Sequence, residues 1–350
     1  MVIEMLRPGT KLQELLKDNN MSRKELAERT GVTEKHIGSI ILGNNNITLS
    51  FAKKLEYVFE LKQNDWIKMQ LDYDDSLKEK KKTEGITDEE EIIYKELLPL
   101  ANYMEINKNE NIYDNIIKMR KYLKVSSLEL VDKLAYNAAY RIRTKKSLLV
   151  DRRVLFAWQM ICENRCSVKK IEGAINIEKL YEVNEKLKSI MNKDLSEQEL
   201  VNTINELLNN YGIVFSIVPN VKGAPVQGFI KELNDKIILC VTTRQKRKDI
   251  FWFTIFHEIA HIMNKDYKNT FVDLTSINSN AEVNADEFAA NTLINSKQYK
   301  IFVLNNEITE TSIRRFAKTQ NVPNYIVVGR LQKDQIIDYN QFTNMLEYFK

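Results

Sequence analysis

Two of the three histidines in the chain stand four residues apart and enclose a glutamate, in the run His257-Glu258-Ile259-Ala260-His261. Residues four apart share one face of a helix, so both imidazoles can bind a single tetrahedral Zn²⁺. Glu258 lies beside them, where it can take a proton from an attacking water as general base and pass it to a leaving amine. The spacing predicts a catalytic zinc centre; packed core histidines or a closed structural zinc site are the alternatives.

A third ligand has to come from another segment, because the remaining histidine, His36, lies far upstream. The segment 281–293 has helical spacing, and within it Glu282 and Asp286 are four residues apart. We expect Glu282 to complete a two-His, one-Glu site with a fourth position open for water. Asp286 either fixes the tautomer of a ligand imidazole or is a solvated helix acid. An apolar stripe would pack this helix on the first one: Ala285, Phe288, Ala289 and Leu293.

Two further roles near this centre stay open. A peptidase needs a hydrogen-bond donor for the developing oxyanion, and Tyr267 and Arg330 are both possible donors. Cys240 ends a predicted strand just before the histidine helix. It is a buried apolar thiol or, as the less favoured alternative, a fourth and inhibitory zinc ligand.

These motifs resemble the ImmA/IrrE family of zinc metallopeptidases. The His-Glu-x-x-His motif is followed by Glu-x-x-Ala-Asp-x-Phe-Ala-Ala and preceded by a small predicted sheet and by Phe253-Thr254, over about residues 200–300. The resemblance implies that the substrate is a repressor protein and that Glu258 is the catalytic residue. It also implies zinc ligands at His257, His261 and Glu282.

A second pattern, over residues 23–42, predicts a helix-turn-helix. Ser22 and Glu25 form a capping-box pair, Gly31 permits the turn, and Thr33 caps the second helix. An ordinary αα-hairpin in a protein-interaction domain is the alternative. DNA contacts are expected at the starts of the two helices, from Arg23, Lys24, Thr33, Lys35, His36 and Ser39.

This region resembles the HigA-type antitoxins of the Xre family. The resemblance covers about residues 6–74 and implies a dimer that binds operator DNA and represses its own toxin-antitoxin operon. The residues that carry it are Arg7-Pro8-Gly9, Leu26-Ala27, Gly31-Val32, Gly43, Ile47-Thr48 and Trp66-x-x-x-Gln70-Leu71-x-Tyr73.

Composition limits the function classes. The 350 residues are 43% apolar and 29% charged, with a net charge of +4, so the chain can bury a core and folds as two or three domains. Neither a dinucleotide-binding nor a P-loop glycine motif is present. Three cysteines without a Cys-x-x-Cys pair indicate reduced thiols in a cytoplasm, and no apolar run approaches membrane-spanning length.

The predicted fold class is α+β and predominantly helical. Short β-branched runs at 213–218, 226–230 and 237–242 predict a small, mostly antiparallel sheet, and helical spacing resumes from Ile250, with Pro323 opening a late helix. The predicted domains are a helix-turn-helix domain (1–74), a charged linker that is a helix extension or a hinge (75–91), a helical middle segment (92–199) and a zincin-like peptidase domain (200–350).

The sequence thus predicts a cytoplasmic transcriptional regulator, antitoxin-like and homodimeric, that binds operator DNA and does not enter a membrane. Its zinc endopeptidase domain would cleave a regulatory protein partner or its own chain. The competing interpretation is a non-enzymatic repressor or antitoxin whose zinc domain only senses or binds a partner, such as a cognate toxin.

Overall fold

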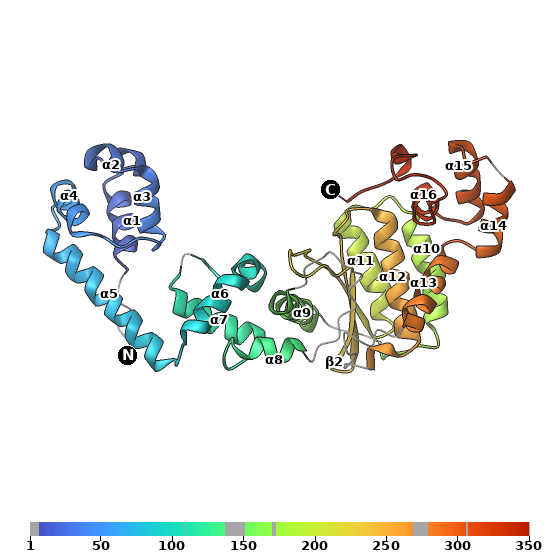
Figure 1. Ribbon diagram of the computed structural model, residues 1–350, viewed down its shortest axis with the longest axis horizontal. Coiled ribbons are helices and arrows are strands. Elements are labelled where there is room, and N and C mark those ends of the chain that lie inside the picture. Colours follow the sequence, from blue (N-terminus) through green and yellow to red (C-terminus); the bar gives the residue numbers. More distant parts are fainter. Residues whose placement is uncertain are drawn as a thin grey trace. The chain divides into compact units, whose positions relative to one another are not determined.

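The computed structural model describes residues 7–108, 110–136, 151–169, 173–268, 279–305 and 307–349 (Figure 1). They form a mostly helical α+β protein with a small three-stranded sheet, which confirms the predicted fold class. The chain divides into two compact units, residues 1–131 and 132–350. The four predicted domains stay a prediction, and residues 137–150 and 170–172 of the predicted middle segment lie outside the described residues.

The N-terminal unit begins with five helices around one apolar core. They are α1 (Pro8–Asp18), α2 (Arg23–Thr30), α3 (Glu34–Ile41), α4 (Leu49–Phe59) and α5 (Gln63–Thr83). The core contains the fully buried side chains of Leu12, Leu26, Ile37, Ile40, Leu55 and Trp66. The tryptophan comes from α5, so the first turn of that long helix belongs to the helix-turn-helix core.

Local signals set the helix ends in this core. The Ser22 hydroxyl accepts a hydrogen bond from the Glu25 N–H (3.0 Å), and Thr33 accepts one from the His36 N–H (3.2 Å), so both predicted N-caps are present. Gly31 ends α2 in the left-handed conformation with φ 62°. Gly9 lets α1 approach α3, since an added Cβ would lie 2.2 Å from the Ile40 carbonyl oxygen.

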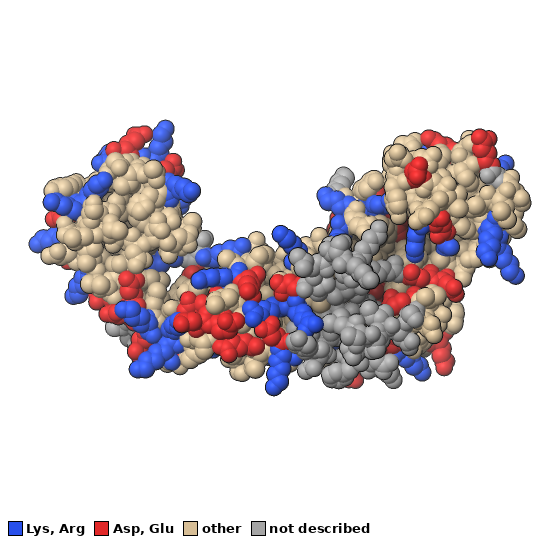
Figure 2. Space-filling view, viewed as in Figure 1, with Lys and Arg blue, Asp and Glu red and all other residues tan. Residues whose placement is uncertain are grey.

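Residues 75–83 of the segment predicted as a linker extend a helix. Helix α5 continues to Thr83, and after a short turn α6 (Asp88–Leu97) begins at the Thr87 cap. It is followed by η1 (Leu98–Met104), α7 (Ile112–Leu123) and α8 (Leu130–Tyr136). Ion pairs join α5 to α6 and α7, and acidic and basic side chains lie intermingled there (Figure 2). The pairs are Lys80 with Asp114, and Lys81 with Asp88 and Glu91.

The C-terminal unit is built on a mixed sheet. It contains β1 (Ile213–Val218), β2 (Gly228–Leu233) and β3 (Lys236–Thr242) in the order β1-β3-β2. A tight turn at Asn234 and Asp235, both with positive φ, pairs β2 with β3 antiparallel. The prediction of a mostly antiparallel sheet is wrong for the other pair, because β1 runs parallel to β3. Strand β3 is buried along its whole length, so it takes the centre, and β1 pairs with its free edge.

Helices cover both faces of this sheet (Figure 1). Helix α9 (Arg152–Ser167) lies on one face, and α11 (Glu197–Asn209) and α12 (Lys248–Met263) lie on the other. The remaining elements are α10 (Leu180–Met191), η2 (Asp266–Lys268), α13 (Ser279–Leu293), α14 (Ser296–Asn305), α15 (Glu310–Thr319), α16 (Asn324–Lys333) and η3 (Thr343–Met345). Pro323 directly precedes α16, as predicted.

Candidate metal centre

The two histidines of the motif lie on α12, the most deeply buried helix of the C-terminal unit. This helix is apolar on nearly all sides because it packs between the sheet and helices α13 and α16. His257 and His261 are 4% and 0% exposed. Buried imidazoles need hydrogen-bond or metal partners, so their surroundings decide what they can do.

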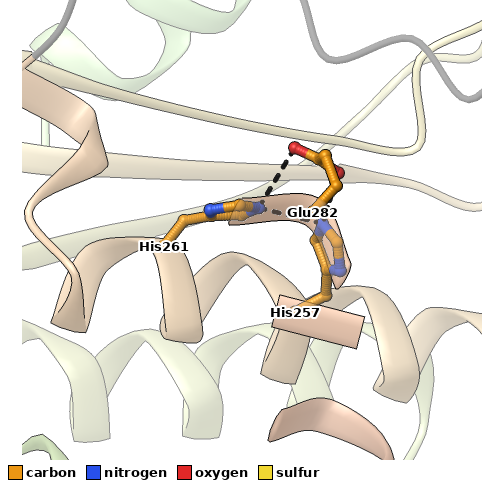
Figure 3. Close-up of side chains that lie close together, drawn as sticks. All are labelled: His257, His261 and Glu282. Carbon is orange, nitrogen blue, oxygen red and sulfur yellow. Dashed lines mark hydrogen bonds and ion pairs between the residues drawn. The ribbon is translucent and has the colours of Figure 1, made fainter. Parts of the chain in front are cut away.

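Helix α13 brings Glu282 to these histidines. Its small residues Ala285 and Ala289 are fully buried and allow α13 to pack closely on α12. The Nε2 atoms of His257 and His261 lie 3.1 Å apart, and the Glu282 carboxylate oxygens lie 3.3 Å and 3.4 Å from them (Figure 3). These three residues form a group that could hold a metal ion.

An aspartate orients each imidazole from its other nitrogen. Asp286, one turn after Glu282 on α13, lies 2.8 Å from His257 Nδ1. Asp266, in η2, lies 2.6 Å from His261 Nδ1. When each Nδ1–H donates to its aspartate, each Nε2 presents a lone pair towards the Glu282 carboxylate. The Asp286 side chain is 37% exposed and contacts His257, so its role as the outer partner of that imidazole stays a prediction.

The spacing of the three converging groups fits a tetrahedral cation. An ion with bonds of about 2.0–2.1 Å to its ligands holds neighbouring ligand atoms about 3.3 Å apart. The two nitrogens lie 3.1 Å apart, close to that edge length, and each lies near a different carboxylate oxygen: His257 Nε2 is 3.3 Å from Glu282 Oε2, and His261 Nε2 is 3.4 Å from Oε1. If both rings are neutral and carry their proton on Nδ1, the lone pairs of the two Nε2 atoms and the carboxylate would repel one another, and a cation between them would remove the repulsion.

The Glu282 carboxylate is ionised in this setting. Burial alone would raise its pKa, but hydrogen bonds and charge interactions with His257 and His261 outweigh burial and hold the pKa well below its usual range. Glu282 therefore offers a negatively charged ligand.

Glu258 is buried next to the histidines and is covered by the edge strand β2. It is 3% exposed, and a Cβ added at Gly228 would lie 2.5 Å from Glu258 Oε1. Only glycine leaves room for this carboxylate beneath the strand. The backbone of β2 therefore runs directly past the residue that the motif predicts as general base.

The two predicted oxyanion donors have other roles in the structure. Tyr267 is packed in the apolar core, where burial raises its pKa. Arg330 donates to Asp334 (2.6 Å) and stacks over the Tyr299 ring. The oxyanion donor stays unassigned.

Cys240 lies on the face of the sheet away from the histidines. Its Sγ is 3.6 Å from the Cys166 Sγ of α9, whereas its neighbours Leu239 and Val241 join the core formed with α12. The interpretation as a buried thiol agrees with this position, and the alternative of a fourth metal ligand is wrong because the sheet separates Cys240 from the site.

The predicted DNA-contacting residues lie at the start of α2 and along α3 with its N-cap. Arg23, Lys24, Thr33 and Lys35 are exposed, whereas His36 and Ser39 are half-buried. The His36 ring packs edge-on against Phe51, with ring centroids 5.7 Å apart. His36 thus supports the fold of this surface as well as lying on it.

Sequence reasoning missed two residues of the metal centre. Asp266 follows His261 by five residues, and its position after the helix end was the only signal available. Gly228 stood inside a predicted β run, where an isolated glycine can mark the close approach of another group.

A family model matches part of the N-terminal region. Residues 12–62 match the family described as helix-turn-helix. No curated protein gives a significant match to the chain. No helix among the described residues has both the length and the apolar character needed to cross a bilayer. The chain therefore carries a helix-turn-helix of DNA-binding transcriptional regulators at its N-terminus.

Proposed function

We propose that the chain is a DNA-binding regulator whose C-terminal unit is a zinc-dependent endopeptidase. The observation that carries this proposal is the convergence of two imidazoles and the Glu282 carboxylate beside the buried Glu258. The resemblance of the motifs in α12 and α13 to the ImmA/IrrE metallopeptidases supports the same assignment. The substrate would be a regulatory protein partner or the chain itself.

The donor set favours zinc over magnesium and calcium. Two imidazole nitrogens and one carboxylate are typical ligands of catalytic zinc, whereas magnesium and calcium prefer oxygen ligands alone. Three protein ligands leave a fourth position for water or substrate. When bound, zinc would supply Lewis-acid activation of water and of the scissile carbonyl.

The chain's own residues would then orient the metal ligands and transfer protons. Asp286 and Asp266 hold the two imidazoles in the tautomer that presents Nε2 to the metal. Glu258 takes a proton from the attacking water and delivers it to the leaving amine nitrogen. Its burial under Gly228 excludes bulk water from this carboxylate, so the proton passes between groups within the site.

The helix-turn-helix would direct this activity to an operator. The exposed start of α3, with Thr33 and Lys35, suits contacts with base edges, and Arg23 and Lys24 suit contacts with phosphates. Paired recognition helices require a homodimer on a two-fold symmetric site. The resemblance to HigA-type antitoxins makes a toxin-antitoxin operon, with a cognate toxin as partner, the first system to examine.

The test compares the wild type with Glu258→Gln, which keeps the size of the base but cannot accept the proton. We expect both proteins to bind zinc and promoter DNA, and only the wild type to cleave its target. The control is Glu287→Gln, at an exposed position of α13 outside the site. The readout is mass spectrometry of fragments of the chain and of the proteins encoded beside it, in cells under stress.

One outcome would select the non-enzymatic alternative. If wild type and Glu258→Gln give the same fragments and the same reporter output, the zinc domain is a sensor or a binding module of a repressor. The observation that favours this alternative is that no residue is assigned as the oxyanion donor.

A further inference from the structure

A cavity of about 230 Å³ opens beside the candidate metal centre. Its walls come from the start of α12, the end of α13, α16 and the residue before β2. The apolar part of the lining consists of Ile250, Phe253, Ala290, Leu293, Ile294 and Ile326. An apolar cavity of about 150 Å³ is large enough to bind benzene, so this one has room for an aromatic ring with its connecting methylene.

Three residues that line the cavity lie next to residues of the candidate metal centre along the same segments of the chain. Phe253 lies one turn before His257 on α12, with ring centroids 6.3 Å apart. Ala290 lies one turn after Asp286 on α13. Gln227, also in the lining, directly precedes Gly228, which covers Glu258. A chain bound at the metal centre can therefore place a neighbouring side chain in the cavity.

Each positively charged side chain of the lining lies close to a carboxylate. Arg247 forms a two-point hydrogen bond with Asp249 (2.9 and 2.8 Å), and Arg330 pairs with Asp334. The ammonium group of Lys333 lies 4.2 Å from the centre of the Phe253 ring and 3.7 Å from Asp286 Oδ2.

Each cation therefore already has a carboxylate nearby, and a charged guest would lose hydration without gaining a new ion pair.

We infer that this cavity is a specificity subsite that accepts a large, uncharged apolar side chain of the substrate next to the scissile bond. The inference rests on the proposed peptidase function for its biological meaning. The binding property itself can be measured without metal and without turnover. The substrate class is thus a protein segment with an aromatic residue, leucine or methionine beside the bond that is cut.

The first experiment measures binding of two small probes to the full chain with ligand-observed NMR. Toluene has the ring and methyl group that the cavity can enclose, and benzoate has nearly the same shape with a charge. We expect toluene to bind and benzoate to bind at least about tenfold more weakly. Equal binding of the two probes, or no binding of toluene, would overturn the proposed subsite.

Two variants locate the bound toluene. Ala290→Phe fills the cavity and should abolish toluene binding, whereas Glu287→Phe adds the same ring at an exposed position of the same helix and should not. Ile250→Ala enlarges the cavity and should admit naphthalene, so the inference can still be tested if Ala290→Phe does not fold. Toluene binding that is unchanged in both cavity variants would place the probe elsewhere and contradict the assignment.

The second experiment examines the zinc-loaded chain with a peptide library. Cuts should concentrate beside aromatic residues, leucine or methionine, and Ile250→Ala should shift the preference to larger side chains. Toluene binding without any peptide cleavage would contradict the proposed function but would still support an apolar binding cavity. Cleavage with no side-chain preference would contradict the subsite and leave the peptidase intact.

Discussion

Glu90 in the N-terminal unit is fully buried and Glu282 in the C-terminal unit is half-buried, and the two carboxylates face opposite kinds of neighbours. The Glu90 carboxylate is fully buried and binds the Arg120 guanidinium (Nε to Oε1, 2.8 Å) and the Leu128 N–H (2.6 Å). The Glu282 carboxylate faces two imidazole nitrogens whose rings are already bonded to aspartates. In the first case the chain supplies the cation, and in the second it supplies a group of residues that could hold one.

This difference indicates what each carboxylate does. A buried carboxylate with its own guanidinium joins helices, here α6 and α7, and needs nothing from outside. A carboxylate among imidazoles gains its balancing charge when an ion binds or when the rings are protonated. The predictions below test this contrast.

The largest effect is expected at the ligands themselves. His261→Ala should reduce zinc from about one per chain to almost none, because two remaining ligands cannot hold the ion. Added zinc should raise the melting temperature of the wild type by mass action and leave that of the variant unchanged. Metal analysis and calorimetry measure both effects. Full zinc occupancy in the variant would show that the ion binds elsewhere.

In the N-terminal unit, Glu90→Ala should lower the free energy of unfolding by about 3–5 kcal/mol, because it leaves the Arg120 charge partly buried without its partner. Zinc binding should not change. Glu89→Ala, at an exposed position of the same helix, serves as the control. A loss below about 1 kcal/mol, measured by urea denaturation, would contradict a structural role for this ion pair.

The Glu90 carboxylate makes the free energy of unfolding of the N-terminal unit depend on pH. Burial would raise the Glu90 pKa, but the hydrogen bonds from Arg120 and from the Leu128 N–H outweigh burial and lower it. Since the folded pKa lies below the unfolded value of about 4.3, the stabilisation is fully present above that pH. It is lost as the pH falls through the folded pKa. Glu90→Gln should remove this part of the pH dependence of the free energy of unfolding. An unchanged pH dependence in the variant would contradict a stabilising role for the ionised Glu90.

A smaller effect is expected from the aspartates that orient the imidazoles. Asp266→Asn and Asp286→Asn should each weaken zinc binding about 10- to 100-fold, since outer partners fix the tautomer of the ligand rings. Competition with a chromophoric chelator measures this change. Asp334→Asn, which alters a carboxylate paired with Arg330, is the matched control and should bind zinc as the wild type does. Unchanged affinity in both test variants would mean that the aspartates only fill space.

The smallest effect concerns the helix-turn-helix. Thr33→Ala removes the N-cap of α3 and should cost about 1 kcal/mol in stability of the N-terminal unit, with Thr33→Ser restoring most of it. Chemical denaturation of the three proteins measures the difference. Equal loss in the serine variant would show that the methyl group, rather than the cap, matters.

How far the sequence predicts these two regions depends on how local the signals are. The caps at Ser22 and Thr33 and the turn at Gly31 act within a few residues, so the helix-turn-helix could be predicted in detail. The pair His257 and His261 is local in the same sense. Glu282 could be predicted because its helix has small residues that allow close packing.

What escaped prediction depends on long-range packing. The parallel pairing of β1 with β3 follows from the burial of β3 between two helical layers, which no single segment encodes. Asp266 reaches His261 from a turn beyond the helix end, and Gly228 matters only because β2 passes over Glu258. Nothing in the spacing of these residues showed which group each would meet.

The most direct test of the central claim is a crystal structure of the zinc-loaded chain with diffraction data recorded on both sides of the zinc absorption edge. We predict an anomalous peak about 2.0–2.2 Å from the Nε2 atoms of His257 and His261 and from a Glu282 oxygen. An anomalous map without a peak there, with the two imidazoles hydrogen-bonded directly to Glu282, would contradict the account and make the group a packed cluster of charged side chains.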